Sequence, residues 1–205
     1  MNLAKKTSFI FEGIRGSGKS TQIKKLKEKL EKDGFEVGLS DNSSLVYPIS
    51  RDLRDYVKRE RLFMSEAILH QLTNLIKVES ILGNYDILLI DRFFLSNLVY
   101  TRAAFQLEEI DLDENLMRGM ILNPFGSDYL DITNTIYLDC NVNMANGRIR
   151  DRISRDKFDH ELQRCARQFY LEELQRYRWN FCIVDGGRET TIVSKDILGY
   201  VEGML

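Results

Sequence analysis

Residues 13–20, Gly-Ile-Arg-Gly-Ser-Gly-Lys-Ser, carry the residue types that bind the phosphates of a nucleoside triphosphate. They fit the pattern G-x-x-x-x-G-K-[ST], in which glycines let backbone N–H groups close around phosphates at the start of a helix. Lys19 is expected to reach the β- and γ-phosphates, and the Ser20 hydroxyl to hold Mg²⁺. The predicted ATP site includes these residues: Gly13, Arg15, Gly16, Ser17, Gly18, Lys19, Ser20 and Thr21.

Asp91 and Arg92 follow the apolar run of residues 87–90. This run predicts a buried strand, and its end lies on the sheet edge where α/β proteins bind ligands. Asp91 is therefore a candidate metal ligand beside Ser20, and Arg92 could clamp an anionic group on the phosphate acceptor. The alternative is that the two residues form only an ion pair at the end of a strand.

An arginine run follows the strand expected at residues 135–140. On one continuous helix, Arg148, Arg152 and Arg155 would share a face, where their charges repel one another unless an anion binds there. A phosphoryl group in transfer is such an anion, so these arginines are candidate catalytic residues. The alternative is a solvated surface helix with neighbouring aspartates as partial counter-charges.

The elements that position these residues alternate between strand and helix. Apolar runs predict strands at 8–13, 35–40, 86–91, 135–140 and 181–186, and helical spacing predicts helices at 18–34 and 65–83, with a short helix near 51–58. In the 65–83 helix, an apolar stripe that includes Ile68, Leu72 and Leu75 is expected to face the core. Strands separated by helices predict a parallel sheet with helices on both faces, in one domain spanning residues 1–205.

The composition fits a globular protein without membrane spans. The 205 residues include 29 basic and 31 acidic residues, and this balance argues against a surface that coats nucleic acid. No stretch is long and apolar enough to suggest a membrane span or a signal peptide. The three cysteines form no C-x-x-C pair and are read as reduced thiols, which predicts a cytoplasmic location.

These elements, in this order, resemble the thymidylate kinase family of nucleoside monophosphate kinases. FEGIRGSGKSTQ resembles the family's FEG-x-D-G-x-G-K-[ST]-T-Q, DRFFLSNLVY its D-R-[YF]-x-x-S-x-x-A-Y, and TIYLDC with RIRDRISRDKFD its strand and arginine-bearing lid. The resemblance implies a P-loop nucleoside triphosphate hydrolase fold, a five-stranded parallel core, ATP with Mg²⁺ as donor, a lid near residues 143–158 and often a homodimer. It also implies that Arg92 holds the acceptor phosphate, that Ser96 and Tyr100 border the acceptor pocket, and that Gly187 and Arg188 lie beside the adenine.

The acceptor side departs from the family pattern. Arg15 stands where the family has an acid that contacts the acceptor sugar, and Arg51 is a candidate replacement for an arginine of the absent T-R-E-P-G stretch. His70 and Asn74 align with the residues that recognise thymine, and both lie opposite the expected apolar stripe. Arg15 therefore suggests an acceptor with more negative charge near its sugar than thymidylate has.

Three functions are consistent with the sequence. The first is a nucleotide kinase that phosphorylates a nucleoside monophosphate or a close analogue. The second is a deoxynucleoside kinase that acts on a free 5′-hydroxyl, in which Glu12 would be the general base; either way Glu12 is a candidate acceptor-site residue. The third is a degenerate, ATP-binding regulatory protein. The expected partners are ATP and a small nucleotide-like acceptor, with no nucleic acid and no membrane.

Overall fold

The computed structural model describes residues 7–40, 53, 55–57, 59–81, 85–111, 113–122, 133–149, 157–176 and 180–205. Within them, five parallel strands form one sheet in the order β2-β3-β1-β4-β5. The strands are β1 (Thr7–Glu12), β2 (Val37–Ser40), β3 (Ile87–Asp91), β4 (Thr133–Asp139) and β5 (Phe181–Asp185). The predicted five-stranded parallel α/β fold is confirmed.

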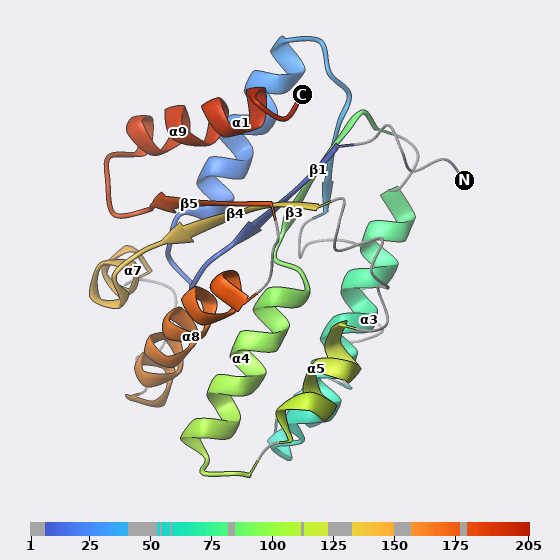
Figure 1. Ribbon diagram of the computed structural model, residues 1–205, viewed down its shortest axis with the longest axis vertical. Helices are drawn as coiled ribbons and strands as arrows, with labels where there is room; N and C mark the ends of the chain where they lie inside the picture. Colours follow the sequence, from blue (N-terminus) through green and yellow to red (C-terminus); the bar gives the residue numbers. More distant parts are fainter. Residues whose placement is uncertain are drawn as a thin grey trace.

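Helices cover both faces of the sheet (Figure 1). On one face lie α1 (Lys19–Lys32) and α9 (Thr190–Glu202), and on the other lie α3 (Phe63–Ile81), α4 (Phe94–Leu107), α5 (Glu114–Leu122) and α8 (Lys157–Arg176). The short helix α7 (Val142–Arg148) follows β4 at the edge of the sheet that carries the phosphate-binding loop. Each face has its own cluster of buried apolar side chains, so the sheet separates two hydrophobic cores.

The sequence pattern of α1 accounts for its position. Ile23, Leu26 and Leu30 are buried, as their helical spacing predicts, and they pack into the cluster between α1, α9 and the sheet. The helix ends at Lys32, and Gly34 follows with φ 95°, a left-handed conformation that glycine adopts without strain. The helix and its stop are therefore both predictable from local residue types.

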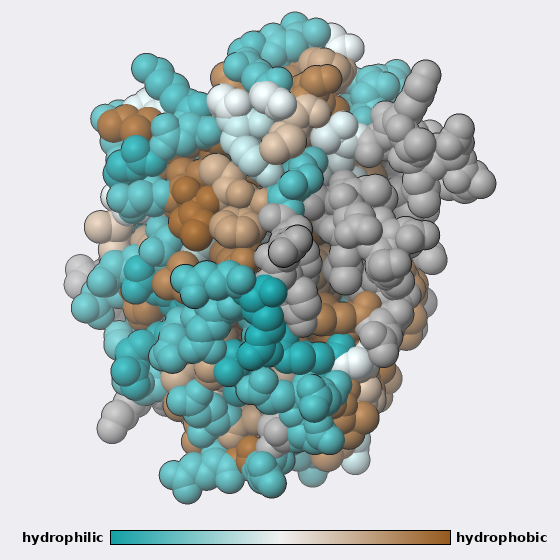
Figure 2. Space-filling model, viewed as in Figure 1, coloured by the Kyte–Doolittle hydropathy of each residue, from teal (hydrophilic) through white to brown (hydrophobic). Residues whose placement is uncertain are grey.

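The apolar stripe predicted for α3 is wrong in part. Ile68 and Leu72 are 42% and 52% exposed, and only Leu75 packs partly against the core. The buried side of α3 instead carries Ala67 and Gln71, spaced four residues apart. Figure 2 shows the resulting apolar surface in brown over α3 and α5 at the lower right.

Hydrogen bonds of its side-chain amide explain why the polar residue Gln71 is buried on α3. The Gln71 side-chain amide donates to the Ile121 carbonyl on α5 at 2.5 Å and accepts from the Asn97 side chain on α4 at 3.2 Å. Asn97 also donates to the Ala67 carbonyl at 2.7 Å. Because every such bond compensates the cost of burying an amide, α3 is held to α4 and α5 partly through polar groups.

Candidate active site

The phosphate-binding loop runs from the end of β1 to the start of α1. Gly13 and Gly16 have φ values of 141° and 79°, and a Cβ at either would collide with a backbone carbonyl, of Leu138 and Ala145 respectively. A side chain at these positions would therefore push the loop away from β4 and α7. The loop keeps its shape because both glycines lack a Cβ.

Lys19 is buried inside this loop, with 6% of its surface exposed. Its Nζ donates to the Gly13 and Ile14 carbonyls, both at 2.9 Å, and to the Ser17 Oγ at 3.3 Å. Burial lowers the pKa of Lys19 well below its ordinary value, and the nearby positive charge of Arg92 lowers it further. The ammonium group is thus held in a site where an additional anion would stabilise its charge.

Ser20 and Asp91 meet at the edge of the sheet, as the sequence predicts. The Ser20 Oγ donates to Asp91 Oδ2 at 3.2 Å, and Asp91 Oδ1 is buried without a hydrogen-bond partner among the described residues. Hard oxygen ligands of this kind suit Mg²⁺, which in triphosphate sites completes its coordination with phosphate oxygens and water. The pair therefore fits a magnesium ion.

Arg92 lies on the chain between β3 and α4. Its φ is 65°, in the left-handed region that non-glycine residues seldom adopt, and its guanidinium lies 5.2 Å from the centre of the Tyr100 ring. Its NH1 donates to the Ser96 Oγ at 3.2 Å. Burial lowers the pKa of Arg92, but Tyr100, Tyr170 and Glu12 outweigh that effect and raise the pKa overall. Arg92 is thus a permanently charged, partly buried group at the end of β3.

Glu12 is the most fully bonded residue of the site, and no part of it is exposed. Its carboxylate accepts hydrogen bonds from the Phe93 and Ser96 amides, from the Ser96 hydroxyl and from the Tyr170 hydroxyl. Burial raises the pKa of Tyr170 well above its ordinary value, and the negative charge of Glu12 raises it further, so Tyr170 stays a hydrogen-bond donor. Tyr170 comes from α8 and belongs to no motif that the sequence analysis used.

A cavity of about 250 Å³ opens beside the phosphate-binding loop on the α1 and α9 side. Arg148, the last residue of α7, crosses it and donates to the carbonyls of Gly186 at 2.9 Å and Ser17 at 3.4 Å. The cavity is lined by Ser17, Gly18, Thr21, Gln22, Leu138, Arg148, Gly186, Arg188, Thr190 and Val193. Five residues predicted to bind ATP therefore surround one space.

The predicted arginine face does not form on one helix that starts before Arg148. Helix α7 ends at Arg148 with Ile149 as its C-cap, and the next helix, α8, begins at Lys157. The helix that carries Arg148 therefore does not continue past Ile149. Arg152, Arg155 and Arg51 lie outside the described residues.

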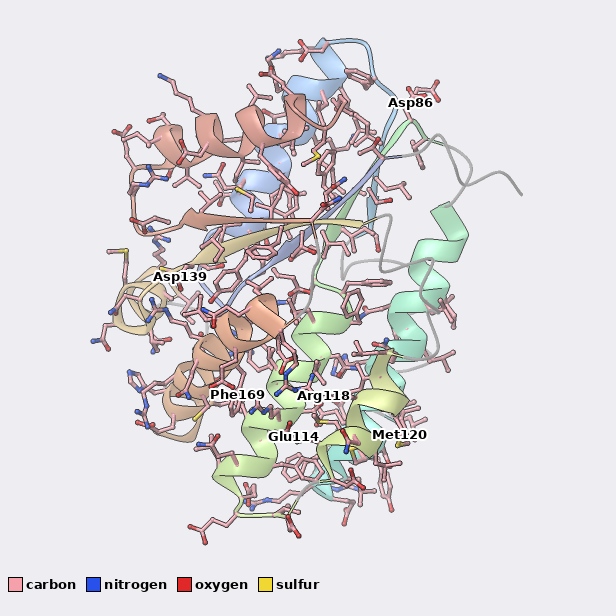
Figure 3. All side chains as sticks on the ribbon, viewed as in Figure 1. Asp86, Glu114, Arg118, Met120, Asp139 and Phe169 are labelled. Atoms are coloured by element: carbon pink, nitrogen blue, oxygen red, sulfur yellow. The ribbon has the colours of Figure 1, made fainter. Side chains whose placement is uncertain are left out.

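Arg15 stands at the tip of the phosphate-binding loop and faces α8. Its guanidinium lies 3.5 Å from the Asp159 carboxylate in the first turn of α8, and its side chain is 47% exposed. Further along α8, Arg167 binds both oxygens of Asp139 at 2.7 Å, where β4 ends (Figure 3). Sequence analysis missed these partners because ion pairs between distant segments leave no local pattern.

The two residues aligned with the base-recognition positions lie on α3. His70 is partly exposed and lies 3.7 Å from Glu66 of its own helix, and Asn74 is half-buried. On the opposite side of the site, the Gly187 amide donates to Asp185 Oδ1 at 2.8 Å, and Arg188 pairs with Asp196. These contacts fix the turn after β5 that ends at the cavity.

The fold and the phosphate-binding loop define a class: a P-loop phosphotransferase. Comparison with known proteins agrees, because the thymidylate kinase family model matches residues 11–197. The chain belongs to the thymidylate kinase family, whose members are ATP-dependent nucleotide kinases. The predicted family and enzyme class are confirmed.

Individual relatives give the same result. A thymidylate kinase of Caldanaerobacter subterraneus subsp. tengcongensis is 27% identical over 95% of this chain and 94% of its own length. One from Fervidobacterium nodosum is 31% identical over 92% of this chain and 94% of its own. Among solved structures, a deoxyadenosine kinase from M. mycoides with bound dCMP and dCDP has a TM-score of 0.69 at 16% identity, covering 96% of this chain and all of that one. That likeness concerns the fold alone.

None of the helices in the described part of the chain combines the length and apolarity needed to cross a bilayer. Cys140, Cys165 and Cys182 are free thiols.

Proposed function

We propose that this protein transfers the γ-phosphate of Mg²⁺·ATP to a nucleoside monophosphate or a close analogue. The observation that carries the proposal is the partly buried Arg92, a charged group fixed on left-handed backbone between β3 and α4. It lies close enough to Lys19 to lower the pKa of that lysine. Two cationic centres at one sheet edge suit two phosphate-bearing substrates, one in the loop and one at Arg92.

The donor site would use the loop, the metal pair and the cavity together. Lys19 would exchange its three oxygen partners in the loop for phosphate oxygens, and Ser20 and Asp91 would hold Mg²⁺. The ion would supply charge neutralisation between the β- and γ-phosphates. The adenosine would occupy the cavity beside Arg148, Gly187 and Arg188.

The state of Glu12 favours a phosphate acceptor over a free hydroxyl. A general base must lie within hydrogen-bond reach of the proton that it removes. All of the hydrogen bonds found for the Glu12 carboxylate come from the protein itself, from Phe93, Ser96 and Tyr170. A phosphate monoester has its second pKa near 6 and is already an anion at neutral pH, so it needs no base.

Transfer would then depend on position and charge. Bringing the two phosphates in line removes most of the entropic cost of the reaction. Lys19, Arg92 and Arg148, with Arg152 and Arg155 as further candidates, would stabilise charge on the phosphoryl group in motion. Arg15 at the loop tip is half-exposed, so it has room to meet negative charge on the acceptor.

The acceptor pocket would extend from Arg92 toward α3. Ser96 and Tyr100 would form its near wall, with His70 and Asn74 at its far end and Arg51 as a further contact. The Tyr100 hydroxyl is buried without a partner among the described residues, so it offers an acceptor group a hydrogen bond. Since neither His70 nor Asn74 is a phenylalanine or an arginine, the preferred base need not be thymine.

The experiment is ADP release from Mg²⁺·ATP with a panel of nucleoside monophosphates, free nucleosides and sugar phosphates. Strong stimulation by one monophosphate, with loss of that activity in Lys19→Ala, is the expected result. Stimulation by free nucleosides alone would favour the deoxynucleoside kinase. ATP binding without stimulation by any acceptor would favour the regulatory protein. In either of these cases the monophosphate kinase proposal falls.

We also propose that two copies of the chain associate through α3. Ile68, Leu72 and Ile76 form an exposed apolar row with four-residue spacing, and Leu116 and Met120 on α5 are exposed as well. Burying a large apolar side chain gains about 1.5–3 kcal/mol, so such a row suits a second apolar surface. Sedimentation should give a dimer that Leu72→Glu converts to a monomer; a wild-type monomer at all concentrations would contradict this.

We also propose a cytoplasmic location for this protein, with which the free thiols are consistent.

A further inference from the structure

The Glu12 carboxylate joins three elements that are far apart in the chain. Oε1 accepts hydrogen bonds from the amides of Phe93 at 3.0 Å and Ser96 at 3.2 Å, which lie at the start of α4. Oε2 accepts hydrogen bonds from the Ser96 hydroxyl and, at 3.0 Å, from the Tyr170 hydroxyl of α8. One fully buried carboxylate at the end of β1 therefore holds both the backbone and a side chain of α4.

This carboxylate replaces the missing N-cap of α4. The first N–H groups of a helix have no partner within the helix, and a polar side chain at the N-cap usually accepts from them. In α4 the N-cap residue is Phe93, which has no such side chain. Glu12 takes over this role from another strand, and its negative charge at a helix N-terminus is favourable in itself.

The same contacts fix the backbone of Arg92. A non-glycine residue at φ 65° costs about 1–3 kcal/mol and persists only where neighbouring contacts hold it. The Arg92 amide donates to the Phe11 carbonyl at 3.0 Å, and the next amide, of Phe93, donates to Glu12. Two adjacent residues at the end of β1 thus hold two adjacent amides, and Arg92 is locked between β3 and α4.

The orientation of the Ser96 hydroxyl connects Glu12 to the Arg92 guanidinium as well. Ser96 has one hydroxyl proton, and the contact of its Oγ with Glu12 Oε2 directs that proton to the carboxylate. The lone pairs of the Ser96 oxygen then face Arg92 NH1 at 3.2 Å, and the one Tyr170 hydroxyl proton is shared between Ser96 Oγ at 2.6 Å and Glu12 Oε2 at 3.0 Å. Without the carboxylate, the proton would be free to turn toward the guanidinium, where it would meet a second donor.

We infer that Glu12 and Tyr170 are positioning residues for the acceptor phosphate, and that they act through Ser96 and Arg92 without touching the substrate. The inference rests on the proposed function, because it needs Arg92 to bind that phosphate. It assigns Glu12 neither to proton transfer nor to direct contact with the acceptor. It also gives a function to Tyr170, a fully buried residue of α8.

The first test compares Glu12→Gln and Tyr170→Phe with a control, Glu173→Gln. Glu173 is equally buried, and it pairs with Arg102 and Arg118 between α4, α5 and α8, away from the site. In Glu12→Gln, one amide oxygen still accepts from the α4 backbone, but the NH₂ group meets the Ser96 and Tyr170 hydroxyls as a donor. We expect the KM for the acceptor to rise at least tenfold, and the KM for ATP to stay within twofold.

Tyr170→Phe removes only one of the four donors to Glu12, so the acceptor KM should rise about threefold. The Glu173→Gln control should change stability and leave both KM values within twofold. If Glu173→Gln raised the acceptor KM as much as Glu12→Gln, the effect would be general destabilisation and the inference would be wrong.

A double-mutant cycle with Arg92→Ala separates positioning from stability. If Glu12 acts through Arg92, Glu12→Gln should reduce acceptor kcat/KM at least tenfold in the wild-type background and less than twofold in the Arg92→Ala background. A merely structural role would give the same reduction in both. Equal reductions in the two backgrounds would overturn the inference.

Calorimetry of monophosphate binding distinguishes failure of this inference from failure of the proposed function. The probe is the monophosphate that gives the highest ADP release, titrated into the full chain without ATP. Wild-type binding with at least tenfold weaker binding by Glu12→Gln supports the inference. Equal binding by both overturns the inference alone. If no monophosphate binds the wild type or stimulates it, the proposed function fails and this inference fails with it.

Discussion

Replacing Arg15 with alanine tests the least usual residue of the phosphate-binding loop. The Arg15–Asp159 distance of 3.5 Å corresponds to a Coulomb energy of about 1 kcal/mol in water and about 5 kcal/mol at an effective dielectric constant of 20. With side chains 47% and 30% exposed, most of this attraction is offset by hydration and side-chain entropy. Such pairs contribute about 0.2–1 kcal/mol, so Arg15→Ala should lower the free energy of unfolding by no more than about 1 kcal/mol.

Activity should change far more if Arg15 meets the acceptor. A hydrogen bond between charged groups contributes about 1.5–3 kcal/mol, equivalent to about 10–150-fold in kcat/KM. We therefore expect the acceptor kcat/KM of Arg15→Ala to fall at least tenfold, measured by ADP release, while urea denaturation detects a loss of about 1 kcal/mol or less. These two quantities differ enough to separate a salt-bridge partner from a substrate-binding residue.

Asp159→Asn is the matched control, because it breaks the same ion pair and keeps the Arg15 guanidinium. Its kcat/KM should stay within fivefold of wild type, the equivalent of about 1 kcal/mol. An Arg15→Ala enzyme that also stays within fivefold would refute the acceptor role of Arg15. Equal large losses in both variants would mean that the ion pair, and not a contact with substrate, supports activity.

Three further predictions concern other charged groups of the structure. Glu173→Gln should destabilise the protein by about 1–3 kcal/mol, because it removes the buried carboxylate shared by Arg102 and Arg118, which keep Glu114 as a partner. At about 2–4 °C per kcal/mol, thermal denaturation should show a fall in Tm of at least 2 °C, and an unchanged Tm would contradict this. Because burial lowers the pKa of Lys19 and bound phosphates would raise it again, ATP binding should take up protons at pH values above the lowered pKa, and it should weaken as the pH rises. Calorimetry in buffers of different ionisation enthalpy should detect this uptake in wild type and not in Lys19→Met. Asp91→Asn should raise the Mg²⁺ concentration for half-maximal activity at least tenfold, and a Mg²⁺ titration with the wild-type value would remove Asp91 from the metal site.

The sequence predicted those parts of the site that are built from residues close together in the chain. The loop glycines, Lys19 and Ser20 lie within eight residues of one another, and their types and spacing predict the loop. Asp91 could be placed because the end of a buried parallel strand has only one edge on which to emerge. The parallel sheet could likewise be predicted from the buried apolar runs along the chain.

What the sequence could not predict depends on contacts between distant segments. The α3 stripe failed because an amide, Gln71, found partners on α4 and α5 and took a core position that hydrophobicity assigns to Leu72. Tyr170 was missed because a tyrosine on an apolar helix face is ordinarily a packing residue. The hydrogen bonds of Glu12 could not be predicted, because its four donors belong to residues 81 to 158 positions away.

The capping of α4 by a strand has a consequence for the order in which the protein opens and folds. Helix ends normally fray, so their amide protons exchange with solvent long before those of the core. The Phe93 and Ser96 amides are instead bound to a carboxylate at the end of a central strand, 81 and 84 residues upstream. Their protons can exchange only when α4 separates from β1. The first turn of α4 therefore shares the slow exchange of the sheet, and during folding it becomes ordered only after β1 is in place.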